Sequence, residues 1–229
     1  RSRWRAAIGE KAGARRRAKG LVEWGAARPP TICQAASHPP PRRGLVHVSN
    51  DGVDTTGMAS DPDARVALPH GPTLRAGGEV LTFVNRNLEP YRGYHTFMRA
   101  LPEVLAARPN AQVVIVGGDV VSYGAAPTDG SWKDMFLNEV RDRLDMSRVH
   151  VVGRVPYDSF RVLMQVTRVH TYLTYPFVLS WSMLEAMAAG ALVVGSDTAP
   201  VREVIRHGTN GLLVDFFDVA GWSRTLIKA

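Results

Sequence analysis

Cysteine is almost absent from the 229-residue sequence, which contains only Cys33. A lone cysteine cannot close an internal disulfide, and Cys33 lies outside any Cys-x-x-Cys or Cys/His pattern typical of a zinc site. The seven histidines are scattered, with no pair spaced as i, i+4 and no acidic partner at ligand spacing. These absences favour a reducing, cytoplasmic setting, and we expect neither a metal ion nor another cofactor.

Long apolar runs are also missing, so the sequence offers no candidate for a membrane-spanning helix or for the apolar core of a secretion signal. No Gly-x-Gly-x-x-Gly pattern follows the first predicted strand, which disfavours a dinucleotide-dependent oxidoreductase. The glycine-containing stretch 52–57 lacks the Lys-Ser/Thr pair that completes a phosphate-binding P-loop. We interpret it as part of a linker.

Positive charge is plentiful but concentrated at one end of the sequence. The net charge is +7, yet residues 1–44 hold eleven Lys or Arg against two Glu, a net charge of +9. The remaining residues hold 17 basic and 19 acidic side chains, a net charge of −2. The basic stretch is rich in Ala, Arg, Gly and Pro, which predicts a mostly disordered leader. The charge is therefore no sign of nucleic-acid binding by the folded part, and we expect no nucleic-acid partner.

From Gly44 onward, short β-branched runs alternate with longer segments of helical period. This pattern predicts an α/β fold, a Rossmann-like doubly wound parallel sheet over residues 80–229, preceded by a linker and entry into the domain at 45–79. Pro102 lies inside one helical segment, which allows a kink or a split there. The predicted strands are 45–49, 80–85, 112–117, 148–152, 169–173, 192–195 and 212–214. The predicted helices are 93–107, 132–144, 157–166, 181–189, 201–207 and 218–228.

The segment around Ser180 predicts an anion site. A helix that begins near Ser180–Ser182 directs free backbone N–H groups and the positive end of its dipole at the edge of the sheet, which suits phosphate. Glu185, one turn further, is placed to accept hydrogen bonds from a pair of sugar hydroxyls. The alternative is a capping box, in which the Glu185 carboxylate returns to the Ser182 N–H. The residues alone leave both interpretations open.

Two arginines follow the strand predicted at 80–85. Arg86 and Arg92 lie six residues apart on a strand-to-helix turn, so their guanidinium groups can converge on one diphosphate. The alternative is that Arg86 is solvated or pairs with Glu89. Gly117-Gly118 end the next strand with a turn that brings the backbone near the cleft.

These segments together resemble the C-terminal donor domain of glycosyltransferase family 4, the group 1 glycosyltransferases of the GT-B fold. The resemblance covers roughly residues 45–229, and an ordered series of matches is far more specific than any one of them. The matching segments are Arg86, Arg92-Gly93, Gly117-Gly118, Val149–Gly153, Leu184–Gly190, Glu203 and Asn210–Val214.

The resemblance implies transfer of a sugar from a nucleotide diphosphate to an acceptor hydroxyl, with retention at the anomeric carbon and without a metal. In such domains a strand-end Arg and a Lys six residues later grip the donor diphosphate. Arg86 matches the first, and Arg92 replaces the Lys while keeping its charge. Glu185 matches the Glu that holds the ribose hydroxyls. We expect these three residues to be catalytic.

Further donor-binding residues follow from the same resemblance. The backbone from Ser180 to Leu184 is expected to face the phosphates, and Gly153-Arg154-Val155 to lie beside the base. The family has another Glu eight positions before Glu185, where this sequence has Phe177, so the sugar contact made by that Glu is not carried over. The expected donor-binding residues are Gly117, Gly118, Asp119, Gly153, Arg154, Val155, Phe177, Ser180, Trp181, Ser182, Met183 and Leu184. For Asp119 a solvated loop position, and for Trp181 a place in the core, are the alternatives.

The resemblance also implies a partner half. The family's N-terminal domain supplies the acceptor site and needs more than about 100 residues, whereas 44 precede the α/β pattern here. We therefore expect a nucleotide-sugar donor, an acceptor of open identity, and little or no turnover by this chain without an acceptor domain. The expected location is cytoplasmic, with peripheral contact at the inner membrane face left open. The alternative function is a non-catalytic nucleotide-binding module.

Overall fold

The computed structural model describes residues 52–175 and 179–229. The basic leader, the strand predicted at 45–49 and Phe177 lie outside these residues. One compact unit starts at Val53 and includes Ser180–Ala229. Residues 53–79, predicted as part of the linker and entry into the domain, belong to this unit. They contain a short antiparallel pair of strands, β1 (Arg65–Ala67) and β2 (Thr73–Arg75).

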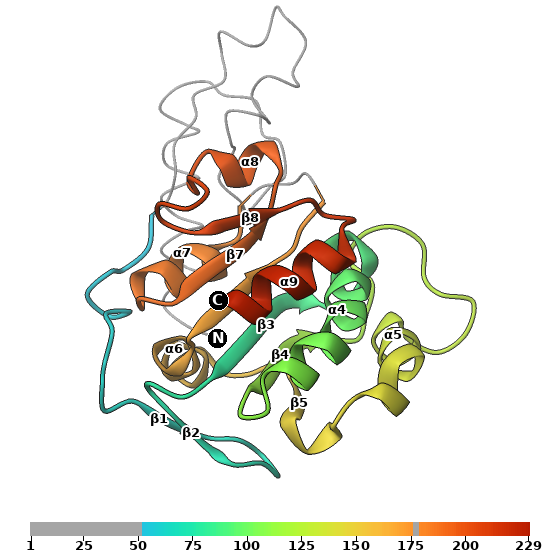
Figure 1. The fold of residues 1–229 in the computed structure, drawn as a ribbon, viewed down its shortest axis with the longest axis horizontal. Coiled ribbons are helices and arrows are strands. Elements are labelled where there is room, and N and C mark those ends of the chain that lie inside the picture. The colour runs from blue at the N-terminus through green and yellow to red at the C-terminus, as the bar shows by residue number, and fades with distance from the viewer. Residues whose placement is uncertain (1–51, 176–178) are drawn as a thin grey trace, which may run out of the picture. The chain divides into compact units, whose positions relative to one another are not determined.

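A six-stranded parallel sheet forms the centre of the unit (Figure 1). Its strands are rich in Val, Ile and Leu because both faces of the sheet are covered. In the strand Gln112–Gly118, for example, residues 113–115 are fully buried. The predicted doubly wound α/β class is confirmed, and the strands predicted from residue 80 onward differ from the observed ones by two residues or fewer at each end. In spatial order the strands are β5 (Val149–Gly153), β4 (Gln112–Gly118), β3 (Val80–Asn87), β6 (Val169–Tyr172), β7 (Leu192–Ser196) and β8 (Leu212–Val214).

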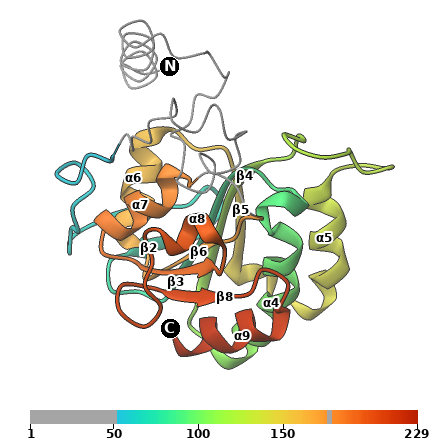
Figure 2. The same ribbon diagram turned by 90° about the horizontal axis from the view of Figure 1, so that it is seen from above.

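Helices cover both faces of this sheet (Figure 2). On one face, α4 (Tyr94–Ala107) packs against α5 (Trp132–Val140) and α9 (Val219–Lys228). On the other face, α6 (Tyr157–Val166) packs against α7 (Trp181–Ala188). The sheet and α4 share an aromatic core, in which the rings of Phe83 and Phe97 stack with centroids 4.6 Å apart.

Two predicted helices differ slightly from the observed ones. α4 runs unbroken through Pro102, so the segment is not split. α5 stops at Val140 and continues as a 3-10 turn over Arg141–Arg143, one residue short of the predicted end.

The helix predicted at 201–207 is wrong in its bounds, because only the short α8 (Ala199–Arg202) forms there. The side chain of Asn210 explains the difference. It accepts a hydrogen bond from the Arg206 N–H at 2.7 Å and donates one to the Val204 carbonyl at 2.9 Å. A side chain that takes these backbone groups replaces the hydrogen bonds that a longer helix would make.

The strand order reverses between β3 and β6. From β3 the chain moves outward to β4 and β5, and it then crosses to the other side of β3 to form β6, β7 and β8. In open parallel sheets, ligands bind outside the carboxyl ends of the strands where the order reverses. The residues that follow β3 and β6 are therefore the first place to look for a site.

Candidate functional site

The two arginines predicted from the sequence lie at the carboxyl end of β3 but in different environments. Arg86, the second-to-last residue of β3, is exposed, and its side chain makes no hydrogen bond or ion pair with another described residue. Arg92, in the 3-10 turn Pro90–Arg92, is only 5% exposed. Its Nη1 donates to Thr174 Oγ1 at 3.2 Å, and its guanidinium carbon lies 5.2 Å from the centre of the Tyr123 ring. Arg86 is thus open to a ligand, whereas Arg92 is held in place by its neighbours.

The alternative pairing of Arg86 with Glu89 is absent from the described residues. Glu89 is 1% exposed, and its Oε2 accepts hydrogen bonds from the N–H groups of Ser122 at 2.8 Å and Tyr123 at 3.1 Å. Buried carboxylates need such donors. Glu89 therefore anchors the loop at 119–131.

The hydrogen-bond partner of Arg92 is itself fixed by the next strand. Thr174, just after β6, is fully buried, and its N–H donates to Ser196 Oγ at 3.2 Å. The Ser196 hydroxyl in turn donates to the Thr174 carbonyl at 2.9 Å. This polar chain connects the ends of β3, β6 and β7, and it holds the Arg92 guanidinium at the point where the strand order reverses.

Gly93 explains how the turn that carries Arg92 can lie so close to β6. Its φ of 67° is in the left-handed region, and a Cβ added there would lie 2.4 Å from the Leu173 Cβ. Only glycine satisfies both conditions. The Arg92-Gly93 pair found in the sequence therefore has a structural reason.

The start of α7 lies at the same edge of the sheet. Ser180 is the N-cap, and its Oγ accepts a hydrogen bond from the Ser182 N–H at 3.4 Å. The Ser180 N–H donates to the hydroxyl of the buried Tyr172, the last residue of β6, at 2.9 Å. The first turn of α7 is thereby fixed beside the end of β6, with the positive end of the helix dipole at the carboxyl edge.

Glu185 does not form the capping box that was the alternative interpretation. The Ser182 N–H is taken by Ser180, and Glu185 Oε1 instead accepts a hydrogen bond from the Tyr157 hydroxyl of α6 at 3.1 Å. Glu185 is 4% exposed, and burial raises its pKa, against the opposing effect of the Tyr157 hydrogen bond. Tyr157 could not be singled out from the sequence, because a tyrosine at a helix start after Pro156 has the pattern of an ordinary surface residue.

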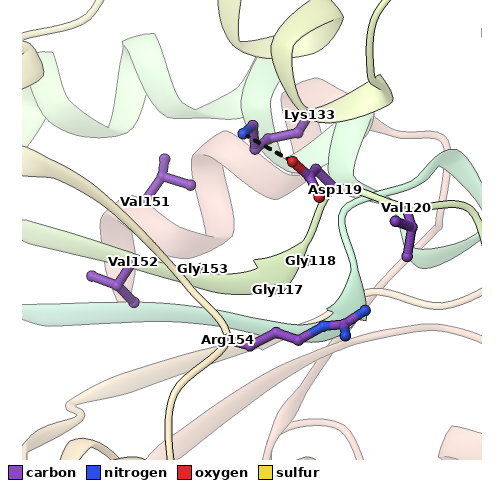
Figure 3. A pocket seen from close by; sticks show the side chains of 9 residues that line it. All are labelled: Gly117, Gly118, Asp119, Val120, Lys133, Val151, Val152, Gly153 and Arg154. Atoms are coloured by element: carbon purple, nitrogen blue, oxygen red, sulfur yellow. Dashed lines mark ion pairs between the residues drawn. The ribbon is translucent and has the colours of Figure 1, made fainter.

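A pocket of about 550 Å³ opens beside the ends of β4 and β5 (Figure 3). In Figure 3, Lys133 and Asp119 lie on one side of it and Arg154 on the other. Lys133, from α5, was not predicted, and its Nζ lies 3.7 Å from Asp119 Oδ2. The pocket brings together five of the predicted donor-binding residues and adds four others. Its lining residues are Gly117, Gly118, Asp119, Val120, Lys133, Val151, Val152, Gly153 and Arg154.

Arg154 connects this pocket to the end of β3. Its Nη2 donates to Asn87 Oδ1 at 2.9 Å, and the Asn87 amide donates to the Ser122 hydroxyl. A Cβ at Gly118 would lie 2.6 Å from Asn87 Oδ1 and 2.7 Å from Arg154 Nε, so a side chain there would break the contact. Gly118 thus leaves room for the Asn87–Arg154 contact, and the predicted approach of the double glycine to a ligand stays a prediction.

The remaining predicted donor-binding residues are less informative. Val155 precedes α6 and does not line the pocket, and Met183 is fully buried in the core. Trp181 and Leu184 are partly buried on α7. Among the described residues, no group of three or more His, Cys, Asp or Glu is placed to hold a metal ion, and no helix is long and apolar enough to cross a bilayer.

Comparisons with known proteins agree with this picture. The family described as "Glycosyl transferases group 1" matches residues 70–229. A phosphatidyl-myo-inositol mannosyltransferase of Mycolicibacterium smegmatis is 30% identical over 183 residues, which cover 77% of this chain and 41% of that protein. A D-inositol 3-phosphate glycosyltransferase of Streptosporangium roseum is 26% identical over 81% of this chain and 41% of its own length. The chain thus spans about two fifths of the length of these curated relatives.

Solved structures share the fold at low sequence identity. A sucrose-phosphate synthase of Thermosynechococcus elongatus has a TM-score of 0.61 at 22% identity, over 78% of this chain and 42% of its own. Anabaena HepE in complex with UDP-glucose has a TM-score of 0.60 at 18% identity, over 82% and 48%. The C-terminal domain of a group 1 glycosyl transferase family protein from Francisella tularensis has a TM-score of 0.61 at 18% identity, over 76% and 86%.

Proposed function

The chain belongs to the group 1 glycosyltransferases, and from this membership we propose that it is the donor-binding half of a retaining family 4 enzyme. It binds a nucleotide diphosphate sugar and, together with an acceptor-binding half, transfers the sugar to an acceptor hydroxyl. The donor, the acceptor, a cytoplasmic location and peripheral membrane contact stay predictions.

The observation that carries this proposal is the set of positive groups at one edge of the sheet. Arg86 lies at the end of β3, Arg92 lies in the turn after it, and the N-terminus of α7 follows the adjacent strand β6. Neighbouring strands lie about 4.8 Å apart, so the three groups come from positions that one diphosphate can span. Negative charge builds on the leaving diphosphate as the bond to the sugar breaks, and these groups stabilise that charge. No step in this scheme uses a metal ion.

The rest of the nucleotide is assigned to the neighbouring parts of the edge. The buried Glu185 carboxylate accepts hydrogen bonds from the two ribose hydroxyls. The base lies in the pocket between the ends of β4 and β5, whose glycine backbone leaves room for a flat ring. This assignment uses the side chains that the fold brings to the carboxyl ends of four adjacent strands, β5, β4, β3 and β6.

Calorimetry with a panel of UDP-, GDP- and ADP-sugars tests the proposal on the 229-residue chain. We expect one donor class to bind, and we expect Arg86→Ala to weaken its binding about 10- to 100-fold, because a hydrogen bond to a charged group contributes about 1.5–3 kcal/mol. Arg75→Ala is the matched control, since Arg75 is also exposed but precedes the amino end of β3. Absence of binding to every donor, or equal effects of the two variants, would refute the donor-site assignment.

A further inference from the structure

Tyr157 is the one described residue whose side chain hydrogen-bonds the Glu185 carboxylate. It is the first residue of α6, and its hydroxyl donates to Glu185 Oε1 at 3.1 Å across the space between α6 and α7. The Tyr157 side chain is 41% exposed, whereas Glu185 is only 4% exposed. The pair therefore connects a buried carboxylate to a ring that a ligand can reach.

The electrostatics of the pair keep the hydrogen bond in one direction. Burial and the nearby Glu185 carboxylate raise the pKa of Tyr157 to about 12, so the phenol stays protonated and acts as the donor. Burial raises the pKa of Glu185, and the bond from Tyr157 opposes that rise. A donor on one carboxylate oxygen favours the ionised form and fixes its rotation.

The geometry leaves part of the carboxylate for a ligand. With Oε1 held by Tyr157, the Oε2 atom of Glu185 has no hydrogen-bond partner among the described side chains and backbone groups. A ribose with two vicinal hydroxyls can donate to Oε2 and to the second lone pair of Oε1. A sugar without these hydroxyls cannot donate to either atom.

We infer that Tyr157 is a positioning residue of the donor site, which orients the Glu185 carboxylate and thereby selects nucleotides whose ribose keeps both hydroxyls. This inference rests on the proposed function, which assigns Glu185 to the ribose. It adds a residue of α6 to a site otherwise built from β3, the β4 and β5 ends, and α7.

The variant Tyr157→Phe tests the inference, because it removes the hydroxyl and keeps the ring. We measure binding of UDP, GDP and ADP, and of their 2′,3′-dideoxy forms, to the full 229-residue chain by calorimetry. The wild-type chain is expected to prefer the ribonucleotide. Tyr157→Phe is expected to bind the ribonucleotide about five- to tenfold more weakly, as the loss of one hydrogen bond predicts, and the dideoxy form with unchanged affinity.

The matched control is Ser147→Ala, which removes an exposed hydroxyl that donates to the Asp145 carboxylate at the amino end of β5, opposite the proposed site. It is expected to leave both affinities unchanged. Equal losses for the ribonucleotide and the dideoxy form in Tyr157→Phe would indicate a merely structural tyrosine and overturn the inference, as would no loss at all. Failure of the wild-type chain to bind any of the nucleotides would instead overturn the proposed function, and the inference with it.

Discussion

At the scale of single residues, His170 shows what a parallel sheet does to a titratable group at its centre. The side chain is fully buried in β6, its Nδ1 is hydrogen-bonded to Thr82 Oγ1 at 2.9 Å, and its Nε2 has no partner among the described residues. Burial lowers its pKa to about 4. His95 and His150 shift in the same direction for the same reason. His170 is therefore neutral in the folded protein at neutral pH.

Folding stability should depend on pH through His170. Below the pKa of about 6.5 that an unfolded chain has, the unfolded state binds a proton that the folded state does not. The free energy of unfolding is therefore highest above pH 6.5 and decreases as the pH falls toward 4. At pH 5 it is lower by about 2 kcal/mol. Urea unfolding at pH 7.5 and pH 5 measures this loss, and His170→Gln should lose less than the wild type. Equal losses in the two proteins would contradict the assignment.

Residue-level reasoning from the sequence recovered positions that carry their own signal. Arg86 and Arg92 stand at and just after the end of β3, and Glu185 stands in α7, the helix that begins at the same edge of the sheet; their roles stay predictions. Tyr157 and Lys133 could not be found in this way. Each acquires its meaning from a partner on another element, Glu185 and Asp119, and a single sequence does not reveal such contacts.

At the scale of elements, the turn between β3 and α4 is the most constrained position of the site. The substitution Gly93→Ala meets two costs, a left-handed φ of 67° and a Cβ placed 2.4 Å from the Leu173 Cβ. We expect it to lower the free energy of unfolding by about 2–4 kcal/mol. Chemical denaturation measures the change.

Gly77→Ala is the matched control for this prediction. Gly77 also has a positive φ, of 83°, but a Cβ there would meet nothing within 4 Å. Its replacement should cost only about 1 kcal/mol, the part due to backbone conformation. If both variants lost the same stability, the close approach of α4 to β6 would not be a constraint.

The elements that the sequence predicted well are the buried parallel strands, whose runs of Val, Ile and Leu have few alternatives. The β1 and β2 pair was missed because each strand has only three residues, too few for a periodic pattern. α8 was misplaced because the Asn210 side chain, several residues away, competes for its backbone groups. Prediction from the local sequence pattern therefore fails where a side chain outside that pattern determines the backbone hydrogen bonds.

At the scale of the whole molecule, the α/β pattern and the ordered motifs were enough to predict the fold class and the family, and both are confirmed. The donor sugar could not be predicted. The family position that often contacts it is Phe177 in this chain, which lies outside the described residues.

At the same scale, we make a prediction about glycosyl transfer by the 229-residue chain. We expect the 229-residue chain to bind its donor but to show no steady glycosyl transfer, because the proposed site accounts for donor binding alone. A radiolabelled-sugar transfer assay with and without an added acceptor-binding domain measures this. Turnover only with the added domain would favour the enzyme over a non-catalytic nucleotide-binding module. Steady turnover by the chain alone would contradict the proposed division of labour.

The Tyr123 ring lies over the Arg92 guanidinium, so a phosphate that binds Arg92 on that side has to displace the ring. The backbone N–H groups of Ser122 and Tyr123 donate to the buried Glu89 carboxylate, which holds the loop in place. Moving the ring away therefore costs free energy. We expect a lone phosphate that displaces the ring to exchange one favourable contact of the Arg92 guanidinium for another. In the proposed site two linked phosphates also engage the exposed Arg86, so we expect a diphosphate to bind more tightly than inorganic phosphate, whichever sugar it carries.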